Sequence, residues 1–582
     1  DILRHIGAFG KYQKLFVLAT VCLEIPTACL VISQVFLAGS ADHWCQVPVS
    51  EAVNCSELQL DSVIDCQQEQ RRAGIPYKLD PDGNKVYSSC ERYVTDNEDA
   101  DSEESPNSTN AIPCDAGWDF DRSRYKSTIT EDFSLVCDRA YYLDISQSMW
   151  FVGVLIGSLG WGTVGDWIGR RKTFILTLIL TTASTISTTF APNIATYTAL
   201  RVVTAACQYG AFLMTFVVAS EIVGPKRRVV VGSMFNMFFS IGYILLSAMA
   251  FLLREWRHLQ LAISLPLFLF FPLIMLLPES PRWLLSKGRS NEALRVLESI
   301  AKVNGTKVPE SQFDVSEFQP RTRPSQLDLL RTPNIRRVTL IMWCNWFVVN
   351  MVYYGLSLST SALGIDDYLA AFVAGAVEIP SILLCRYVME RFGRRPTLVA
   401  FYVTGGVSCL ITVFIPVGSA RAAVAMVGKF AITAVFNHVY IYACELYPTV
   451  IRSMGVGSCS MVARVSGILC PFILRLGKYW GPLPLIIFGG SSVIAGVLSV
   501  MLPETLGRNL PDTIAEVEEF GKGRDFRQWF QRFHQRQERG CQPSADFTPL
   551  STKPEKGNQP LSTMDYAPLS TSDGPPTSLE TV

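Results

Sequence analysis

The chain has 582 residues, of which 49% are hydrophobic and 18% are charged. This composition is too apolar for an ordinary soluble protein, and the chain is too long for one small core. Lys plus Arg and Asp plus Glu balance at 51 each, so the net charge indicates no nucleic-acid partner. The composition therefore predicts a membrane protein.

Long apolar runs recur along the chain after a short N-terminal segment, 1–14. Each run is near the roughly 20 residues that a helix needs to cross a bilayer. The pattern predicts an all-α protein embedded in the lipid bilayer. Twelve candidate spans follow one another at 15–39, 142–163, 173–191, 195–220, 229–253, 259–278, 337–360, 368–389, 396–417, 421–446, 452–475 and 483–503.

Basic residues collect after the second span, after the fourth span and throughout segment 279–336. Short loops rich in Lys and Arg mark the cytoplasmic side of a membrane. We therefore predict that these connections and both termini are cytoplasmic.

The polar segment 40–141 is predicted to be an extracellular loop, and it contains six cysteines. In an oxidising compartment, six cysteines are expected to form three disulfides; their connectivity stays open, and metal binding is the weaker alternative. Asn54 and Asn107 begin sequons and are the predicted glycosylation sites. The cysteines are Cys45, Cys55, Cys66, Cys90, Cys114 and Cys137.

Two segments outside the spans carry patterns of their own. In 279–336, the stretch NEALRVLESIAK has apolar residues at helical spacing and predicts short helices. In the predicted cytoplasmic tail, 504–582, aromatic residues and arginines of 522–540 fit a helix lying on the inner leaflet or a solvated helix packed on the protein. After about residue 540 the chain is rich in Pro, Ser and Thr and is predicted to be disordered. Its terminal Val582 is a weak candidate ligand for a PDZ domain.

The stretch GDWIGRRKT at 165–173 returns in similar form as MERFGRRPT at 389–397. Three pairs of landmarks share nearly the same offset, 224 or 225 positions: Asp166 and Glu390, Glu221 and Glu445, and Pro278 and Pro503. The chain is therefore predicted to consist of two six-helix halves in the same orientation, 15–278 and 337–503. Parallel halves around a central site suit alternating access.

Carboxylates at the cytoplasmic helix ends would pair with arginines or with the positive N-terminus of a neighbouring helix. Pairs that form only when the cytoplasmic side is shut would favour an outward-facing state. Asp166 and Glu390 are the stronger candidates, because topology does not require them, whereas each arginine is equally well explained as a topology signal. The predicted gating residues are Asp166, Arg170, Arg171, Glu221, Glu390, Arg394, Glu445 and Arg452.

Four motifs and the long cysteine-bearing loop give the chain a family resemblance. GxxxDxxGRRK at 162–172, PESPRWLL at 278–285, ELYPTVIR at 445–452 and PETLG at 503–507 resemble the organic ion transporters of the major facilitator superfamily, most of all the organic cation and carnitine transporter branch. The resemblance implies the major facilitator fold and a polyspecific plasma-membrane carrier of small organic ions, with no chemical step. Sodium coupling stays open.

Charged residues inside spans are costly and mark functional sites. The spans contain Glu24, Arg201, Glu378, Lys429 and Arg464. Glu378 is the best partner for a substrate cation, or else pairs with Arg464. The resemblance places a substrate-site residue at Arg464, where cation-selective relatives carry an acid and anion or carnitine carriers carry arginine. Arg464 would then hold the carboxylate of a zwitterion, pair with Glu378, or bind chloride.

Aromatic faces attract quaternary ammonium ions. Phe212 and Phe216 share one helix face, and Trp346 and Tyr353 share another. The resemblance places these four in a central cavity, which is completed by Phe239 and Asn437.

The sequence contains no metal-ligand spacing, no phosphate-binding loop and no nucleophile constellation, so we expect neither an enzyme nor a cofactor. The leading prediction is a carrier of organic cations and carnitine-like zwitterions. The alternatives are an organic anion exchanger, a sugar carrier, or a receptor whose large loop binds a partner.

Overall fold

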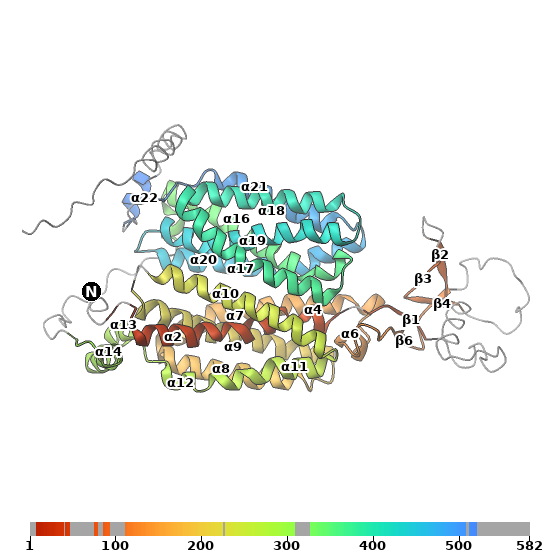
Figure 1. Cartoon of the computed structure of the whole chain (residues 1–582), viewed down its shortest axis with the longest axis horizontal. Coiled ribbons are helices and arrows are strands. Elements are labelled where there is room, and N and C mark those ends of the chain that lie inside the picture. Colours follow the sequence, from red (N-terminus) through yellow and green to blue (C-terminus); the bar gives the residue numbers. More distant parts are fainter. Residues whose placement is uncertain are drawn as a thin grey trace, which may run out of the picture. The chain divides into compact units, whose positions relative to one another are not determined.

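Figure 1 shows the protein as a computed structural model. The described residues are 7, 9–39, 41–46, 75–79, 85–93, 111–224, 227–308, 326–507, 511 and 513–520, and all of them belong to the unit Asp1–Gly523. Several predictions fall outside these residues: Cys55, Cys66, Asn54, Asn107, the segment 522–540 and the tail that ends at Val582.

The N-terminal half begins with a helix that is broken twice, after Cys22 and after Ile32. The last helix of this half is also interrupted, because Pro266 and Pro272 lack the N–H donor that a regular α-helix needs. The helices of this half are α2 (Lys11–Cys22), α3 (Glu24–Ile32), α4 (Gln34–Leu37), α7 (Tyr141–Ile168), α8 (Arg170–Thr188), α9 (Ile194–Ile222), α10 (Arg228–Leu252), α11 (Trp256–Ser264), the 3-10 helix η4 (Leu265–Phe270) and α12 (Leu273–Leu276).

The C-terminal half repeats this arrangement, but its first and last spans are single helices rather than broken ones. Asp366 begins its second helix by accepting a hydrogen bond from the backbone N–H of Leu369 at 3.0 Å. The helices of this half are α16 (Pro333–Leu358), α17 (Asp367–Phe392), α18 (Arg394–Val413), α19 (Ser419–Leu446), α20 (Arg452–Arg475) and α21 (Leu483–Ser499), with short 3-10 turns at Thr360–Leu363 and Leu476–Lys478.

Short helices connect the halves and follow the last span. They are α13 (Pro281–Ser286), α14 (Ser290–Asn304), α15 (Asp328–Arg331) and α22 (Ile514–Phe520). The stretch NEALRVLESIAK, for which the spacing predicts a helix, lies inside α14. The halves meet where α10 packs against α17 and α7 packs against α20, as Figure 1 shows.

Ten helical stretches within the described residues are long and apolar enough to cross a membrane. Of the twelve predicted spans, 173–191 and 483–503 form helices that fall short of this measure. α21 has only 17 residues, and α8 begins with three basic residues and is rich in Thr and Ser. Most α8 hydroxyls bond to the helix itself. Thr173, for example, donates to the carbonyl oxygen of Gly169 at 2.8 Å, so much of their polarity is satisfied internally. Thr185 instead bonds to Ser264 of α11 at 3.1 Å.

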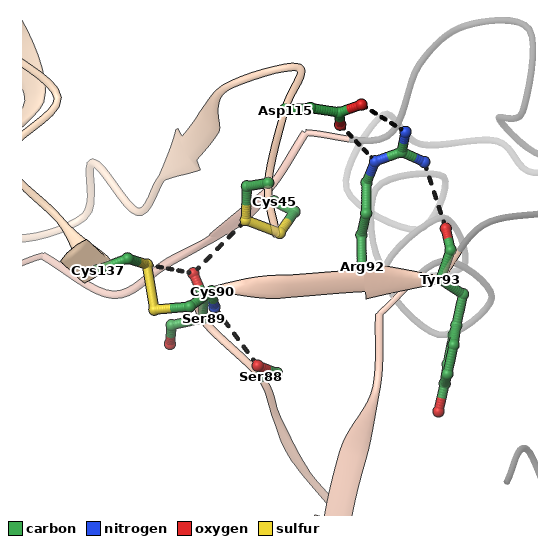
Figure 2. The surroundings of a disulfide bond; sticks show 9 residues. Cys45, Ser88, Ser89, Cys90, Arg92, Tyr93, Asp115 and Cys137 are labelled. Carbon is green, nitrogen blue, oxygen red and sulfur yellow. Dashed lines mark hydrogen bonds and ion pairs between the residues drawn. A yellow bond between two sulfur atoms is a disulfide. The ribbon is translucent and has the colours of Figure 1, made fainter. Parts of the chain in front are cut away.

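The described part of the loop after α4 contains three two-stranded antiparallel pairs and two disulfides, Cys45–Cys114 and Cys90–Cys137 (Figure 2). The expected disulfides are therefore confirmed for four of the six cysteines. Beside them, Arg92 donates two hydrogen bonds to Asp115 at 2.7 and 3.1 Å, which lowers the pKa of that carboxyl group. The pairs are β1 (His43–Cys45) with β6 (Trp118–Phe120), β2 (Tyr77–Leu79) with β3 (Lys85–Tyr87), and β4 (Glu91–Tyr93) with β5 (Ala111–Pro113).

The two copies of the repeated motif build the same turn. Gly169 separates α7 from α8 with φ 103°, and Gly393 separates α17 from α18 with φ 107°, a conformation that favours glycine. Glu279 accepts a hydrogen bond from the backbone N–H of the residue after Gly169 at 2.7 Å, and Glu504 accepts the equivalent bond after Gly393 at 2.8 Å. The duplication predicted from the offset of 224 residues therefore has a structural counterpart.

We call the end of the bundle at these two glycines the motif end. The end that carries the disulfides Cys45–Cys114 and Cys90–Cys137 is the disulfide end.

Candidate functional site

A cavity lies between the halves, lined by α3, α7, α9 and α10 of one and α16, α17, α19 and α20 of the other. Its volume is about 120 Å³, which at roughly 10–15 Å³ for each buried water is room for roughly ten water-sized groups. This space suits a small organic ion. Ten aromatic side chains form much of the wall: Trp150, Phe151, Tyr209, Phe212, Phe235, Phe239, Tyr353, Tyr354, Phe436 and Tyr440.

Glu378 of α17 lines the cavity, but its charge is already compensated. Its Oε1 lies 3.0 Å from Nζ of Lys429 and accepts a hydrogen bond from the hydroxyl of Tyr353 at 2.8 Å. Its Oε2 accepts a hydrogen bond from Ser240 at 2.7 Å, across the interface between the halves. Lys429 also donates to Ser357 at 2.5 Å, and its Nζ lies 3.4 Å from the ring centroid of Tyr353.

The sequence predicted that Glu378 would bind a substrate cation or pair with Arg464, and the structure shows a different partner. Its ion-pair partner is Lys429 on α19, and not Arg464. Both members of the pair are buried, with side-chain exposures of 2% each. Removing one partner of such a pair leaves an uncompensated buried charge, whereas the intact pair presents a nearly neutral wall. Arg201 is another charged residue inside a span, and the sequence assigned it no role. It donates hydrogen bonds to Gln34 and Gln147 within its own half.

Arg464 of α20 lines the same cavity and is 8% exposed. Its guanidinium carbon lies 5.1 Å from the ring centroid of Tyr209, which belongs to the opposite half. Its Nε has no hydrogen-bond partner. In the described part of the chain, no carboxylate lies within ion-pair distance of Arg464. A buried guanidinium in this state is ready to bind an anionic group.

Glu24 of α3 is the second charged group that forms no ion pair with any residue that the structure describes. It lines the cavity, is 3% exposed, and its Oε1 has no hydrogen-bond partner. The sequence marks Glu24 as a charge inside a span without assigning it a role. The cavity thus combines one compensated carboxylate, Glu378, with a carboxylate and a guanidinium that have no counter-ion in the described ranges of the chain.

The other predicted substrate residues divide into two layers. Phe212, Phe239, Tyr353 and Asn437 line the cavity. Asn437 accepts a hydrogen bond from the side-chain amide of Asn236 at 3.0 Å, which again joins the halves.

Phe216 and Trp346 lie behind this first layer. Phe216 stacks on Phe212 with ring centroids 5.8 Å apart, and the ring of Trp346 lies 4.3 Å from that of Tyr440. Both residues therefore support lining residues without forming the wall. Each shares a helix face with a residue that lines the cavity. This brings each of them close to the cavity without placing it in the wall.

The predicted gating residues lie at the motif end, where their ion pairs stay within one half. Asp166 pairs with Arg170 at 2.7 Å and Glu390 with Arg386 at 3.3 Å, and the two members of each pair are four positions apart in the sequence. Arg394 pairs with Glu445 at 3.0 Å.

Three further gating candidates form no ion pair across the halves with any residue that the structure describes. Glu221, the counterpart of Glu445, has an Oε2 atom without a partner. Arg452 bonds to Tyr447 and Thr449 at 3.2 Å each, while the backbone N–H of Arg171 lies 3.4 Å from Glu279.

The disulfide end carries ion pairs that cross between the halves. Arg124 pairs with Asp367 at 2.9 Å, and the hydroxyl of Tyr125 donates to the same carboxylate at 2.9 Å. Burial and the Asp367 carboxylate raise the pKa of Tyr125, so this donor keeps its proton. Arg475, at the end of α20, pairs with Asp144, at the start of α7, at 2.7 Å. These residues lie in no repeated motif, so sequence patterns gave no signal for them.

The bundle of two like halves around a polar-aromatic cavity defines a membrane carrier, and comparison with known proteins agrees. The sequence profile described as "Sugar (and other) transporter" matches residues 90–515. The chain is 37% identical to the "Organic cation transporter protein" of Drosophila melanogaster over 90% of this chain and 95% of that protein. It is 34% identical to the "Beta-alanine transporter" of the same organism over 89% of each.

A solved proton:xylose symporter of the major facilitator superfamily superposes with a TM-score of 0.52, at 17% identity, over 66% of this chain and 90% of the symporter. This likeness confirms the predicted major facilitator fold. The chain belongs to the sugar (and other) transporter family, and the organic ion transporter resemblance seen in its motifs is confirmed by its relatives. Members of this family are transporters and not enzymes.

Proposed function

We propose that this protein is a polyspecific carrier of small organic cations and carnitine-like zwitterions that works by alternating access. The central observation is the cavity between the halves, which combines aromatic walls with the unpaired charges of Glu24 and Arg464. Aromatic faces and a carboxylate attract ammonium groups, and apolar walls tolerate varied shapes. The names of relatives that carry organic cations and beta-alanine support the same substrate class.

The proposal includes an orientation in the plasma membrane. The motif end and both termini face the cytoplasm, since basic residues collect there. The disulfide end faces outward, where an oxidising environment maintains Cys45–Cys114 and Cys90–Cys137. Glycosylation at Asn54 and Asn107 belongs to the same proposal, because both sequons lie between Cys45 and Cys114 in the sequence, in the loop that is proposed to face outward.

The ion pairs at the two ends support a working cycle. The crossing pairs Arg124–Asp367 and Asp144–Arg475 favour a state that is shut at the disulfide end. In the opposite state these pairs separate, and Asp166, Glu390 and Glu221 find partners across the motif end. The halves would then rock around the substrate in the cavity.

Uptake by intact cells tests the proposal. Cells that express the protein at their surface are given labelled tetraethylammonium, carnitine or para-aminohippurate, each with and without sodium. We expect uptake of the first two above mock-transfected cells and none of para-aminohippurate, because Glu24 repels a substrate that carries only negative charge. Dependence on sodium would add ion coupling to the proposal. Uptake of none of the three, or of para-aminohippurate alone, would contradict it.

A PDZ-domain partner at the C-terminus is a separate part of the proposal. Val582 and its carboxylate match the end of such a ligand, although Glu580 stands where common ligands carry Ser or Thr. Loss of binding to PDZ domains after removal of Val582 would support this partner, and unchanged binding would exclude it.

A further inference from the structure

Three charged groups line the cavity: the carboxylates of Glu24 and Glu378 and the guanidinium of Arg464. Among the described residues, only Glu378 has a counter-ion, which is Lys429. Glu378 has Lys429, Tyr353 and Ser240 around it. Glu24 and Arg464 have no counter-ion within the described residues, and no ion pair joins them to each other. The cavity therefore offers one free negative and one free positive group to the same ligand.

Burial makes these two groups strong binding sites. Glu24 is 3% exposed and Arg464 is 8% exposed, so both have given up most of their hydration in the folded protein. An isolated buried charge costs several kcal/mol, and a ligand of opposite charge recovers part of that cost. Charge attraction is also several times stronger in such a cavity than in water.

The two groups come from opposite halves. Glu24 belongs to α3 of the N-terminal half and Arg464 to α20 of the C-terminal half. Tyr209 of the N-terminal half lies against the guanidinium and holds it near the interface. A ligand that contacts both charges therefore spans the boundary along which the halves move. A simple cation contacts only Glu24 and leaves Arg464 without a partner.

We propose that Glu24 binds the ammonium group and Arg464 the carboxylate of one zwitterionic substrate, which makes the site selective for small betaines and amino acids with separated charges. This inference rests on the proposed transport function and identifies the ammonium-binding residue. The sequence favours Glu378 for this role. In the structure, however, the charge of Glu378 is compensated by Lys429, so Glu378 forms a nearly neutral part of the wall. The volume of about 120 Å³ limits the ligand to a small molecule.

Three chemically matched probes test each charge separately. Carnitine carries a trimethylammonium and a carboxylate, choline carries only the trimethylammonium, and 3-hydroxybutyrate carries only the carboxylate. Their apparent KM or inhibition constants are measured in cells that express wild type, Glu24→Gln or Arg464→Gln, after correction for surface protein. Glu298→Gln, an exposed side chain on α14, is the control for a lost carboxylate away from the cavity.

We expect Glu24→Gln to raise the KM for carnitine and for choline alike, by about tenfold or more. Arg464→Gln should raise the KM for carnitine by a similar factor and leave choline unchanged or better bound. Glu298→Gln should match wild type. Choline should lose affinity only in Glu24→Gln and 3-hydroxybutyrate only in Arg464→Gln. This crossed pattern is specific to charge recognition, because a merely structural change would weaken all three probes in the same variant.

Two results would overturn the inference. One is a Glu24→Gln variant whose KM values for choline and carnitine stay within about twofold of wild type. The other is an Arg464→Gln variant that loses choline as strongly as carnitine. If Glu24→Gln fails to reach the surface, Glu24→Ala, which also removes the charge, serves in its place, with the same expected and contradicting results. Failure of wild type to take up any cation or zwitterion contradicts the proposed function instead, so the two failures are distinguishable.

Discussion

Charged side chains join the two halves at the disulfide end, whereas at the motif end they pair within each half. Arg124–Asp367 and Asp144–Arg475 cross the interface. Asp166–Arg170, Arg386–Glu390 and Arg394–Glu445 do not. On the proposed mechanism, these crossing pairs keep the disulfide end shut and must break during transport. At the other end, the described ion pairs place no such restraint on the halves.

The motif end instead stabilises its own helix turns. Glu504 accepts hydrogen bonds from four backbone N–H groups, with distances between 2.8 and 3.0 Å. Glu279 does the same for the matching turn of the other half, accepting from the backbone of Arg170 and Ser280. A repeated motif thus marks a repeated turn, and its part in gating requires a different conformation from the one described.

The largest effect is expected from Glu504→Gln, which removes the charge that caps α18. Hydrogen bonds to a charged group contribute about 1.5–3 kcal/mol each, although not additively. We therefore expect a loss of about 2–3 kcal/mol of stability and a melting temperature lower by several degrees in detergent. The matched variant Glu279→Gln should show a similar loss. A shift between inward and outward states with no change in melting temperature would contradict the assignment of these residues to the turn.

A smaller effect is expected from Asp367→Asn at the disulfide end. Asp367 is buried but its partner Arg124 is 46% exposed, so solvent screening limits the pair to about 1 kcal/mol. Loss of this ion pair should raise, about fivefold, the population of the state that is open at the disulfide end. The labelling rate of Val31→Cys, a cavity position, by an impermeant thiol reagent on intact cells measures this population.

The matched control for that experiment is Asp138→Asn, an exposed carboxylate at the same end. It should leave the labelling rate unchanged. Equal rates for Asp367→Asn and Asp138→Asn would remove the Arg124–Asp367 pair from the set of contacts that keep this end shut.

The smallest effect on stability is expected from Asp166→Asn at the motif end. Asp166 is 73% exposed and pairs with Arg170 across the turn between α7 and α8, and such an exposed pair contributes below about 0.5 kcal/mol. We expect normal surface expression together with lower maximal uptake, because the carboxylate forms its functional pair only when the motif end closes. Unchanged maximal uptake would remove Asp166 from the gate. Glu390→Gln, at the matching position of the other half, should behave in the same way.

The sequence predicted those features whose cause is local. The spacing of GDWIGRRKT and MERFGRRPT revealed the two halves, since a turn that needs glycine and a capped helix leaves a fixed pattern. The six cysteines of segment 40–141 predicted disulfides. Glu378 and Arg464 were identified as cavity residues because a charge inside an apolar span is costly unless it is functional or paired.

Local sequence patterns could not predict which residues these charged side chains contact. Whether Glu378 meets Lys429 or Arg464 depends on how α17, α19 and α20 are rotated against one another, which no spacing within one helix determines. Trp346 and Phe216 show the same limit: each shares a helix face with a lining residue but lies one layer behind it. Arg124 and Asp367 are 243 positions apart, so their contact follows from the fold alone.

The central claim is that transport requires the disulfide end to open and close around the cavity. Asp144 and Arg475 lie on opposite halves at that end, so replacing both with cysteine allows a short bifunctional maleimide to link α7 to α20. We predict that linked protein loses nearly all uptake of carnitine, while each single cysteine variant treated in the same way keeps it. Uptake by fully linked protein at the rate of the untreated double variant would contradict alternating access at this site.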